Sequence, residues 1–189
     1  MRHLCRMAKQ LSTVHAIPGP VALQLEYSLT ERTIEQEHIP AAGTCGLGIV
    51  PWSPLAAGFL TGKYQRGATG PGGEGRLNGA NPFGDSKFTD RNWSILDGLQ
   101  KVAAETGKPP AQIALAWALS QRGITSLIIG VSKPAQLQDN IASLDVVLPP
   151  AQLQQLNDIS ALAPVFPYPI FTPAINKNIF GGNTVAGWE

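Results

Sequence analysis

Short aliphatic runs alternate with helical patterns along most of the chain, and this alternation constrains the fold more than any other feature. The aliphatic runs lie at 21–26, 47–53 and 126–130, and proline or glycine residues bound them. Helical patterns separate and follow them, so the predicted order is strand, helix, strand, helix, helix, strand, helix, helix. That order is typical of parallel strands joined by helical crossovers. The sequence therefore predicts an α/β fold with buried strands.

The predicted helices have recognisable ends. Proline opens the helices expected at 110–122, 133–142 and 150–160, and Gly107 stops the one expected at 87–105. A weaker helical pattern at 31–42 is limited by Pro40 and Gly43. The proline-rich region from Leu162 is predicted to be irregular. The chain is therefore divided into residues 1–161 and a tail, residues 162–189.

Length and charge exclude some classes of function. A chain of 189 residues suits one domain or a part of one. A net charge of +1 gives no field that would collect nucleic acid or an anionic membrane. Charged residues make up 14% of the chain, against roughly a quarter in ordinary domains, which leaves apolar surface for a partner to cover.

The cysteines and the first residues predict a location. Cys5 and Cys45 lack CxxC spacing, so we expect two reduced thiols in a reducing compartment. The basic start MRHLCRMAKQ is not followed by an apolar signal region, and no run of about 18 apolar residues occurs. The predicted location is the cytoplasm.

Two glycine motifs look like phosphate-binding loops, and both fail their structural tests. In the stretch PWSPLAAGFLTGKYQRG, only three residues separate Gly58 from Gly62, and Tyr64 follows Lys63 where a P-loop needs serine or threonine. Residues 70–75 match GxGxxG but neither follow a strand nor open a helix. A third interpretation remains, because (β/α)8 barrels hold phosphate in loops after their last strands. The stretch after 47–53 lies where such a loop would be.

Three segments, in order and spacing, resemble the C-terminal half of the aldo/keto reductase family. They are QLEYSLTERTIEQEHIP, GIVPWSPLAAGFLTGKY and SLIIGVSKPAQLQDNIASLDVVL. The resemblance covers about Ile17 to Leu162. It implies a partial (β/α)8 TIM barrel, about the last three βα units. It also implies an NADP(H)-dependent oxidoreductase that reduces a carbonyl to an alcohol by hydride transfer.

The resemblance implies two residues at the nicotinamide ring. Gln24 matches the family glutamine that holds the carboxamide, for which an amide side chain has both donor and acceptor. Trp52 matches the aromatic residue on which the ring stacks. Without the resemblance, Gln24 could equally be a buried glutamine bonded to backbone, and Trp52 a core tryptophan.

The resemblance also implies the residues that hold the rest of the cofactor. Those matching the pyrophosphate loop are Ser53, Leu55, Gly58 and Lys63. Those matching the segment that grips the adenosine 2′-phosphate and adenine are Gly130, Ser132, Lys133, Gln136 and Asn140. Taken alone, SKPAQLQDN is an ordinary capped helix start. Residues 67–85 correspond to the family loop that folds over the cofactor.

The catalytic half of the family's site has no counterpart. The resemblance begins just before the sixth barrel strand, so the family's catalytic tyrosine, lysine, aspartate and histidine have no match. His3, His15 and His38 lie away from strand ends, and Tyr27 matches a position that is not the acid. We therefore expect no catalytic residue, no metal site and no activity by the chain alone.

Other functions stay open. An N-terminal half would complete the site for a small carbonyl substrate, which the sequence does not identify. Open strand edges invite a homo-oligomer or a complementing chain. The alternatives are a non-catalytic nucleotide-binding or dimerising module, or a gene fragment that does not fold.

Overall fold

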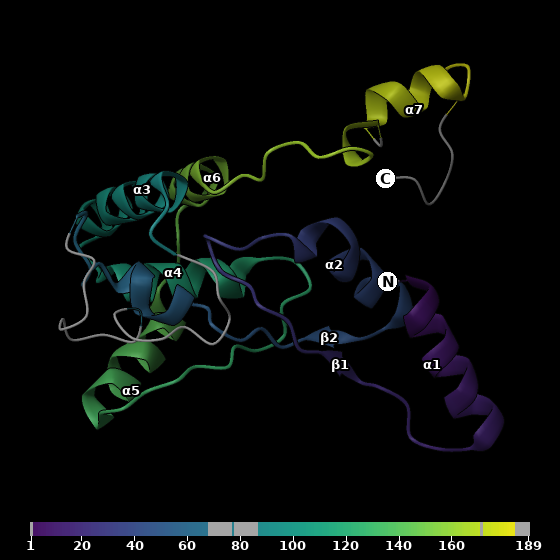
Figure 1. Cartoon of the computed structure of the whole chain (residues 1–189), viewed down its shortest axis with the longest axis horizontal. Helices are drawn as coiled ribbons and strands as arrows, with labels where there is room; N and C mark the ends of the chain where they lie inside the picture. The colour runs from purple at the N-terminus through teal and green to yellow at the C-terminus, as the bar shows by residue number, and fades with distance from the viewer. Residues whose placement is uncertain (1, 68–76, 78–86, 171, 184–189) are drawn as a thin grey trace.

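The computed structural model describes residues 2–67, 77, 87–170 and 172–183. The elements follow one another as α1 (Arg2–His15), β1 (Ala22–Leu23), α2 (Ile34–Cys45), β2 (Gly48–Ile49), η1 (Ala56–Thr61), α3 (Asp90–Thr106), α4 (Pro110–Ser120), α5 (Pro134–Ile141), η3 (Ala142–Asp145), α6 (Pro150–Ile159), η4 (Tyr168–Ile170) and α7 (Pro173–Ile179). Figure 1 shows α3, α4 and α6 grouped on one side of the two strands and α1 and α2 on the other.

Three extended segments run parallel, with β2 in the middle. In the β1–β2 pair, Ala22 lies opposite Gly48, and an isolated bridge continues the pairing to Glu26 and Trp52. On the other side of β2, the Ile128 amide donates to Pro51 O at 2.8 Å. The segment 124–128 is therefore paired with β2 although it is not a regular strand. The prediction of a third strand at 126–130 is confirmed only as an extended segment that begins earlier.

The prediction that the strands are buried is confirmed for the middle segment, where Ile49 is fully buried, and wrong for the two outer ones. Val21 is 81% exposed and Ile128 is 39% exposed. An apolar run indicates a strand, but burial requires another element to cover it. In the described part of the chain, β1 has a partner on one side only.

Helix α2 passes through the residues predicted to limit it. Pro40 and Gly43 lie inside the helix, which ends at Gly46 in the left-handed conformation. The Gly46 amide donates to Gly43 O and Ala42 O, so a glycine cap decides the end. Proline removes one backbone donor, and the buried Ala41 and Ala42 that follow it hold the helix against its neighbours.

Two helices were not predicted. Helix α1 packs on α2 through Cys5, which is buried although its neighbours along the chain are exposed. In the tail expected to be irregular, the Thr172 hydroxyl caps α7 by accepting from the Ile175 amide. The division at residue 161 remains a prediction.

The core lies around α4, whose residues 112–118 are all buried. As predicted, Pro110 opens this helix, but it ends at Ser120 and does not reach residue 122. Helix α3 is capped by Thr89, which accepts from the Asn92 amide, and ends at the predicted Gly107. Within the described ranges, each helix is too short or too polar to span a bilayer.

Candidate functional site

The predicted site residues lie at the carboxyl ends of the three parallel segments. Parallel segments bring their carboxyl ends to the same edge, and loops that follow them are where α/β proteins bind ligands. Gln24 lies near the end of the first segment, Trp52 ends the second, and Gly130 follows the third. Gln24 and Gly130 are exposed, and Trp52 is half-buried.

The loop after β2 holds an unusual backbone. Ser53, Ala56 and Ala57 have φ angles of 57°, 49° and 55°, and Gly58 follows at 89°. Non-glycine residues in this left-handed region are strained, and such strain concentrates at functional sites. Phe59 and Leu60, both fully buried, anchor the end of the loop. Core packing therefore maintains the strained conformation.

Lys63 places a positive charge over this loop. A Cβ atom added at Gly58 would lie 3.1 Å from the Lys63 ammonium nitrogen, so the lysine side chain crosses the glycine. The same ammonium lies 5.1 Å from the centre of the Tyr64 ring, and Lys63 is exposed. A cation above consecutive left-handed residues is a combination that suits a phosphate group. The residues present therefore fit the pyrophosphate that the family resemblance implies.

The segment after Gly130 leads into α5, whose N-cap residue, Lys133, makes no side-chain cap hydrogen bond. Gln136 Oε1 accepts from the Ser132 amide at 2.9 Å, and it lies 3.2 Å from the Ser132 hydroxyl. Ser132 and Lys133 are exposed just before α5, and Asn140 is buried within it. The ordinary capped start that the sequence left open is therefore not formed by a side chain. A ligand that used Gln136 would have to replace or share this hydrogen bond.

An ion pair that the sequence does not indicate lies at the same carboxyl ends. The Lys87 ammonium lies 3.0 Å from Glu26 Oε1, and Glu26 is bridged to Trp52. The Lys87 amide oxygen also accepts from the Asn92 side chain, which ties the start of α3 to this edge. The two charged residues are 61 positions apart, so no local pattern could have predicted the pair.

Tyr27 is held in a buried network. Its hydroxyl donates to Glu35 Oε1 at 2.6 Å, and Arg32 contacts the same carboxylate through two nitrogens. Burial, then the contact with Glu35, raises the pKa of Tyr27 above its ordinary value. Arg32 also donates to Ser160 Oγ at 2.7 Å. The network joins Glu35 of α2 to Ser160, which follows α6, and that Tyr27 is not the acid stays a prediction.

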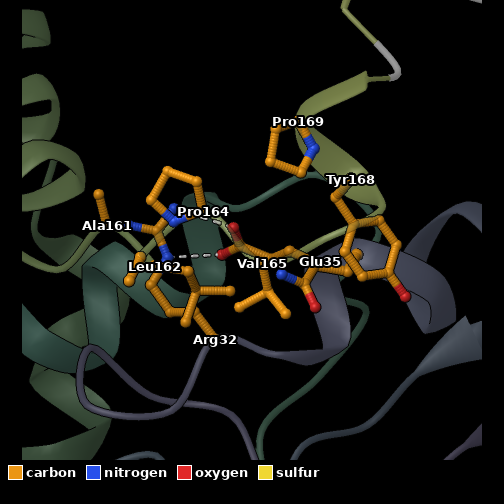
Figure 2. Close-up of a pocket in the computed structure, with 10 residues that line it drawn as sticks. Arg32, Glu35, Ala161, Leu162, Pro164, Val165, Tyr168 and Pro169 are labelled. Carbon is orange, nitrogen blue, oxygen red and sulfur yellow. Dashed lines mark hydrogen bonds and ion pairs between the residues drawn. The ribbon is translucent and has the colours of Figure 1, made fainter.

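A pocket of about 410 Å³ lies beside this network, between the start of α2 and the segment that precedes α7. Figure 2 shows Arg32 and Glu35 paired at its wall, with Leu162, Val165 and Tyr168 around them. None of the residues predicted to bind cofactor lines it. The pocket is thus separate from the candidate site.

The three histidines differ in exposure. His3 and His15 are exposed, while the buried His38 Nδ1 has no hydrogen-bond partner within the described ranges. No cluster of three or more His, Cys, Asp or Glu residues suited to a metal ion occurs among the described residues. The loop predicted to fold over the cofactor, residues 67–85, lies almost wholly outside the described residues.

Comparison with known proteins assigns the chain to a family. The aldo/keto reductase family model matches residues 3–161. A probable voltage-gated potassium channel beta subunit of Oryza sativa is 37% identical over 68% of this chain and 40% of its own length. An uncharacterised oxidoreductase of Bacillus subtilis is 37% identical over 75% of this chain and 40% of its own length. A probable aldo-keto reductase of Glycine max is 36% identical over 75% of this chain and 40% of its own length. The chain thus spans less than half the length of these relatives, and it belongs to the aldo/keto reductase family, whose fold is an α/β barrel.

Proposed function

We propose that this chain is the NADP(H)-binding, C-terminal portion of an aldo/keto reductase, built from about the last three βα units of a TIM barrel. The observation that carries the proposal is the strained loop after β2, with Lys63 folded over Gly58. Relatives named as an oxidoreductase and as a probable aldo-keto reductase support an oxidoreductase role. We place the protein in the cytoplasm, in keeping with two free thiols.

The chain's own residues would bind and orient the cofactor. Trp52 offers an aromatic face for the nicotinamide ring, and the exposed Gln24 amide would bond its carboxamide. The pyrophosphate would lie against the loop of Ser53, Leu55 and Gly58 under Lys63. The adenosine end would lie along Gly130, Ser132, Lys133, Gln136 and Asn140. When bound, NADPH supplies the hydride for reduction of a small carbonyl substrate.

We propose that none of the described residues protonates the carbonyl oxygen. Tyr27 is fully buried and its hydroxyl donates a hydrogen bond to Glu35, and the buried Lys87 ammonium is paired with Glu26. We therefore propose that the isolated chain binds NADPH but does not reduce carbonyls. The missing acid would come from an N-terminal half, whether on the same polypeptide or on another.

Titration of the purified chain with NADPH tests the binding step. Tryptophan fluorescence should be quenched saturably, Trp52→Ala should abolish the saturable part, and Trp52→Phe, which keeps an aromatic face, should retain binding measured by calorimetry. Circular dichroism would show that both variants are folded. A folded wild-type chain that fails to bind NADPH would refute the cofactor site.

A second function, a non-catalytic nucleotide-binding or dimerising module, is favoured by one comparison. Two relatives, from Oryza sativa and Arabidopsis thaliana, are named as probable channel beta subunits, so the family includes proteins named as parts of larger assemblies. Supplying a catalytic half separates the alternatives: restored carbonyl reduction supports the reductase, while NADPH binding without restored activity supports the module. A chain that shows no cooperative thermal transition would be the non-folding fragment.

A further inference from the structure

Glu26 and Lys87 form a largely buried ion pair to which the family resemblance assigns no role. A Glu26 carboxylate oxygen lies 3.0 Å from the Lys87 ammonium nitrogen, and the two side chains are 22% and 10% exposed. Removing two ions from water is costly, and apolar residues of similar volume often stabilise a fold as well. The place of the pair at the carboxyl ends of the parallel segments points to a role in the candidate site.

Glu26 shares one face of the parallel ladder with both residues predicted to hold the nicotinamide ring. Side chains alternate between the two faces of an extended segment, so Gln24 and Glu26 project to the same side. Leu23 and Leu25, which alternate with them, pack against the hydrophobic core. Glu26 is also the bridge partner of Trp52, and paired residues of a ladder project to the same face. Gln24, Glu26 and Trp52 thus project from the side of the ladder opposite the core.

Core packing fixes the backbone at Lys87. The carbonyl oxygen of Lys87 accepts from the buried Asn92 side chain at 3.0 Å. The ring centre of the next residue, Phe88, lies 6.0 Å from that of Phe59, the buried residue that anchors the strained loop. Lys87 is thus held by contacts to α3 and to the loop after β2. Its ammonium contributes a positive charge at a defined place, and Glu26 supplies the compensating negative charge.

A fixed pair of opposite charges matters most to a ligand group whose own charge changes. The nicotinamide ring carries a positive charge in NADP⁺ and none in NADPH, whereas the rest of the dinucleotide is the same in both forms. An unpaired ammonium near the ring would weaken the binding of NADP⁺, and an unpaired carboxylate would strengthen it. While both charges are present, their effects on the ring oppose each other. The relative affinity for the two forms therefore reports the charge balance at this face.

We propose that the Glu26–Lys87 pair sets the affinity of the site for oxidised relative to reduced cofactor. Lys87 holds the end of the loop that precedes α3 beside the ladder, and Glu26 keeps its charge from acting against the oxidised ring. The pair thus lets one site accept NADPH and release NADP⁺ without a strong bias from either charge. This role rests on the NADP(H) site proposed above and adds two residues to it.

Calorimetric titration of the whole chain with NADPH and with NADP⁺ tests this role through the ratio of the two dissociation constants, NADP⁺ over NADPH. Glu26→Gln leaves the ammonium unpaired and should raise the ratio by at least roughly 3-fold. Lys87→Met leaves the carboxylate unpaired and should lower the ratio by at least roughly 3-fold. The double variant has neither charge and should return the ratio to the native value. Structural damage alone does not produce opposite shifts that cancel in the double variant.

An exposed ion pair provides the matched control. The Arg66 and Asp97 side chains lie 2.6 Å apart and are 55% and 62% exposed, so Arg66→Met and Asp97→Asn should leave the ratio unchanged. Glu26→Ala and Lys87→Ala make room for water around the remaining charge, and they cover the case in which an unpaired buried charge prevents folding. The same opposite shifts are expected of them. Circular dichroism would show which variants are folded.

The outcomes separate this role from the proposed function. A folded native chain that binds neither form of the cofactor would refute the NADP(H) site, and the role of the pair with it. If the native chain binds both forms, a ratio that stays constant in the single variants would overturn only the role of the pair. A ratio that moves in the same direction in Glu26→Gln and Lys87→Met would do so too.

Discussion

Gly58 has a left-handed backbone conformation, and the side chain of Lys63 lies across it. Its φ of 89° is one that L residues rarely adopt, and Lys63 occupies the space where a Cβ would be. Because the tip of a lysine moves easily, the backbone angle dominates the cost of any substitution. The backbone angle of Gly58 and the position of Lys63 thus distinguish the candidate site from an ordinary loop.

Gly58→Ala should lower the free energy of unfolding by about 1–2 kcal/mol, because alanine is disfavoured in the left-handed region. Chemical denaturation would measure it. The matched control is Gly43→Ala: Gly43 lies inside α2 with no atom within 4 Å of an added Cβ, so alanine should raise stability by about 0.5–1 kcal/mol. Repeating Gly58→Ala in a Lys63→Ala background should give nearly the same loss. A much smaller loss there would show that contact with Lys63, and not φ, sets the cost.

Tyr27 should make stability fall at high pH. Burial and Glu35 raise its pKa in the folded state above the unfolded value of 10.0. Above that value the unfolded chain releases the proton while the folded chain keeps it, so the stabilisation present below pH 10 is lost as pH rises. The slope should reach about 1.4 kcal/mol per pH unit. Denaturation from pH 8 upward should show a smaller loss for Tyr27→Phe, and equal curves would contradict the assignment.

At the scale of elements, α3 and α6 approach closely at a glycine. A Cβ added at Gly98 would lie 2.4 Å from Ile159 Cδ1, and the other nearby Ile159 atoms are at 3.5 Å. The sequence pattern shows a glycine inside a helix, which on propensity alone weakens the helix. The packing of α6 explains why it is there.

Whether Gly98→Ala raises or lowers the free energy of unfolding should therefore depend on Ile159. In the native background we expect a loss of about 1 kcal/mol, because the methyl group overpacks the helix contact. In an Ile159→Val background, where Cδ1 is absent, the same change should raise stability by about 0.5–1 kcal/mol through helix propensity. Thermal and urea unfolding of the native chain, the two single variants and the double variant would measure the coupling. Losses of the same size in both backgrounds would rule out the proposed contact.

At the scale of the whole molecule, apolar surface is left uncovered at both ends of a well-packed centre. Helix α4 is almost wholly buried, whereas Leu4 and Val147 at the ends are largely exposed. The chain therefore presents apolar surface that another polypeptide segment could cover.

Local chemistry explains what could be predicted. Prolines 110, 134 and 150 open helices because proline suits the first helical turn, and Gly107 ends one because it adopts a left-handed conformation. The candidate site was predicted from the family resemblance of residues in chain order. The structure brings those residues to one edge of three parallel segments, and their contact with a cofactor stays a prediction.

The sequence by itself determined where most helices begin, the parallel order of the extended segments and the family. Only the tertiary structure decided which apolar runs are buried, that α2 continues through Pro40, and that Glu26 pairs with Lys87. The physical reason is that proline, glycine and periodicity act within a few residues. Burial and ion pairing depend on which distant segments meet, and in this chain some of the apolar surface meets nothing within the described residues.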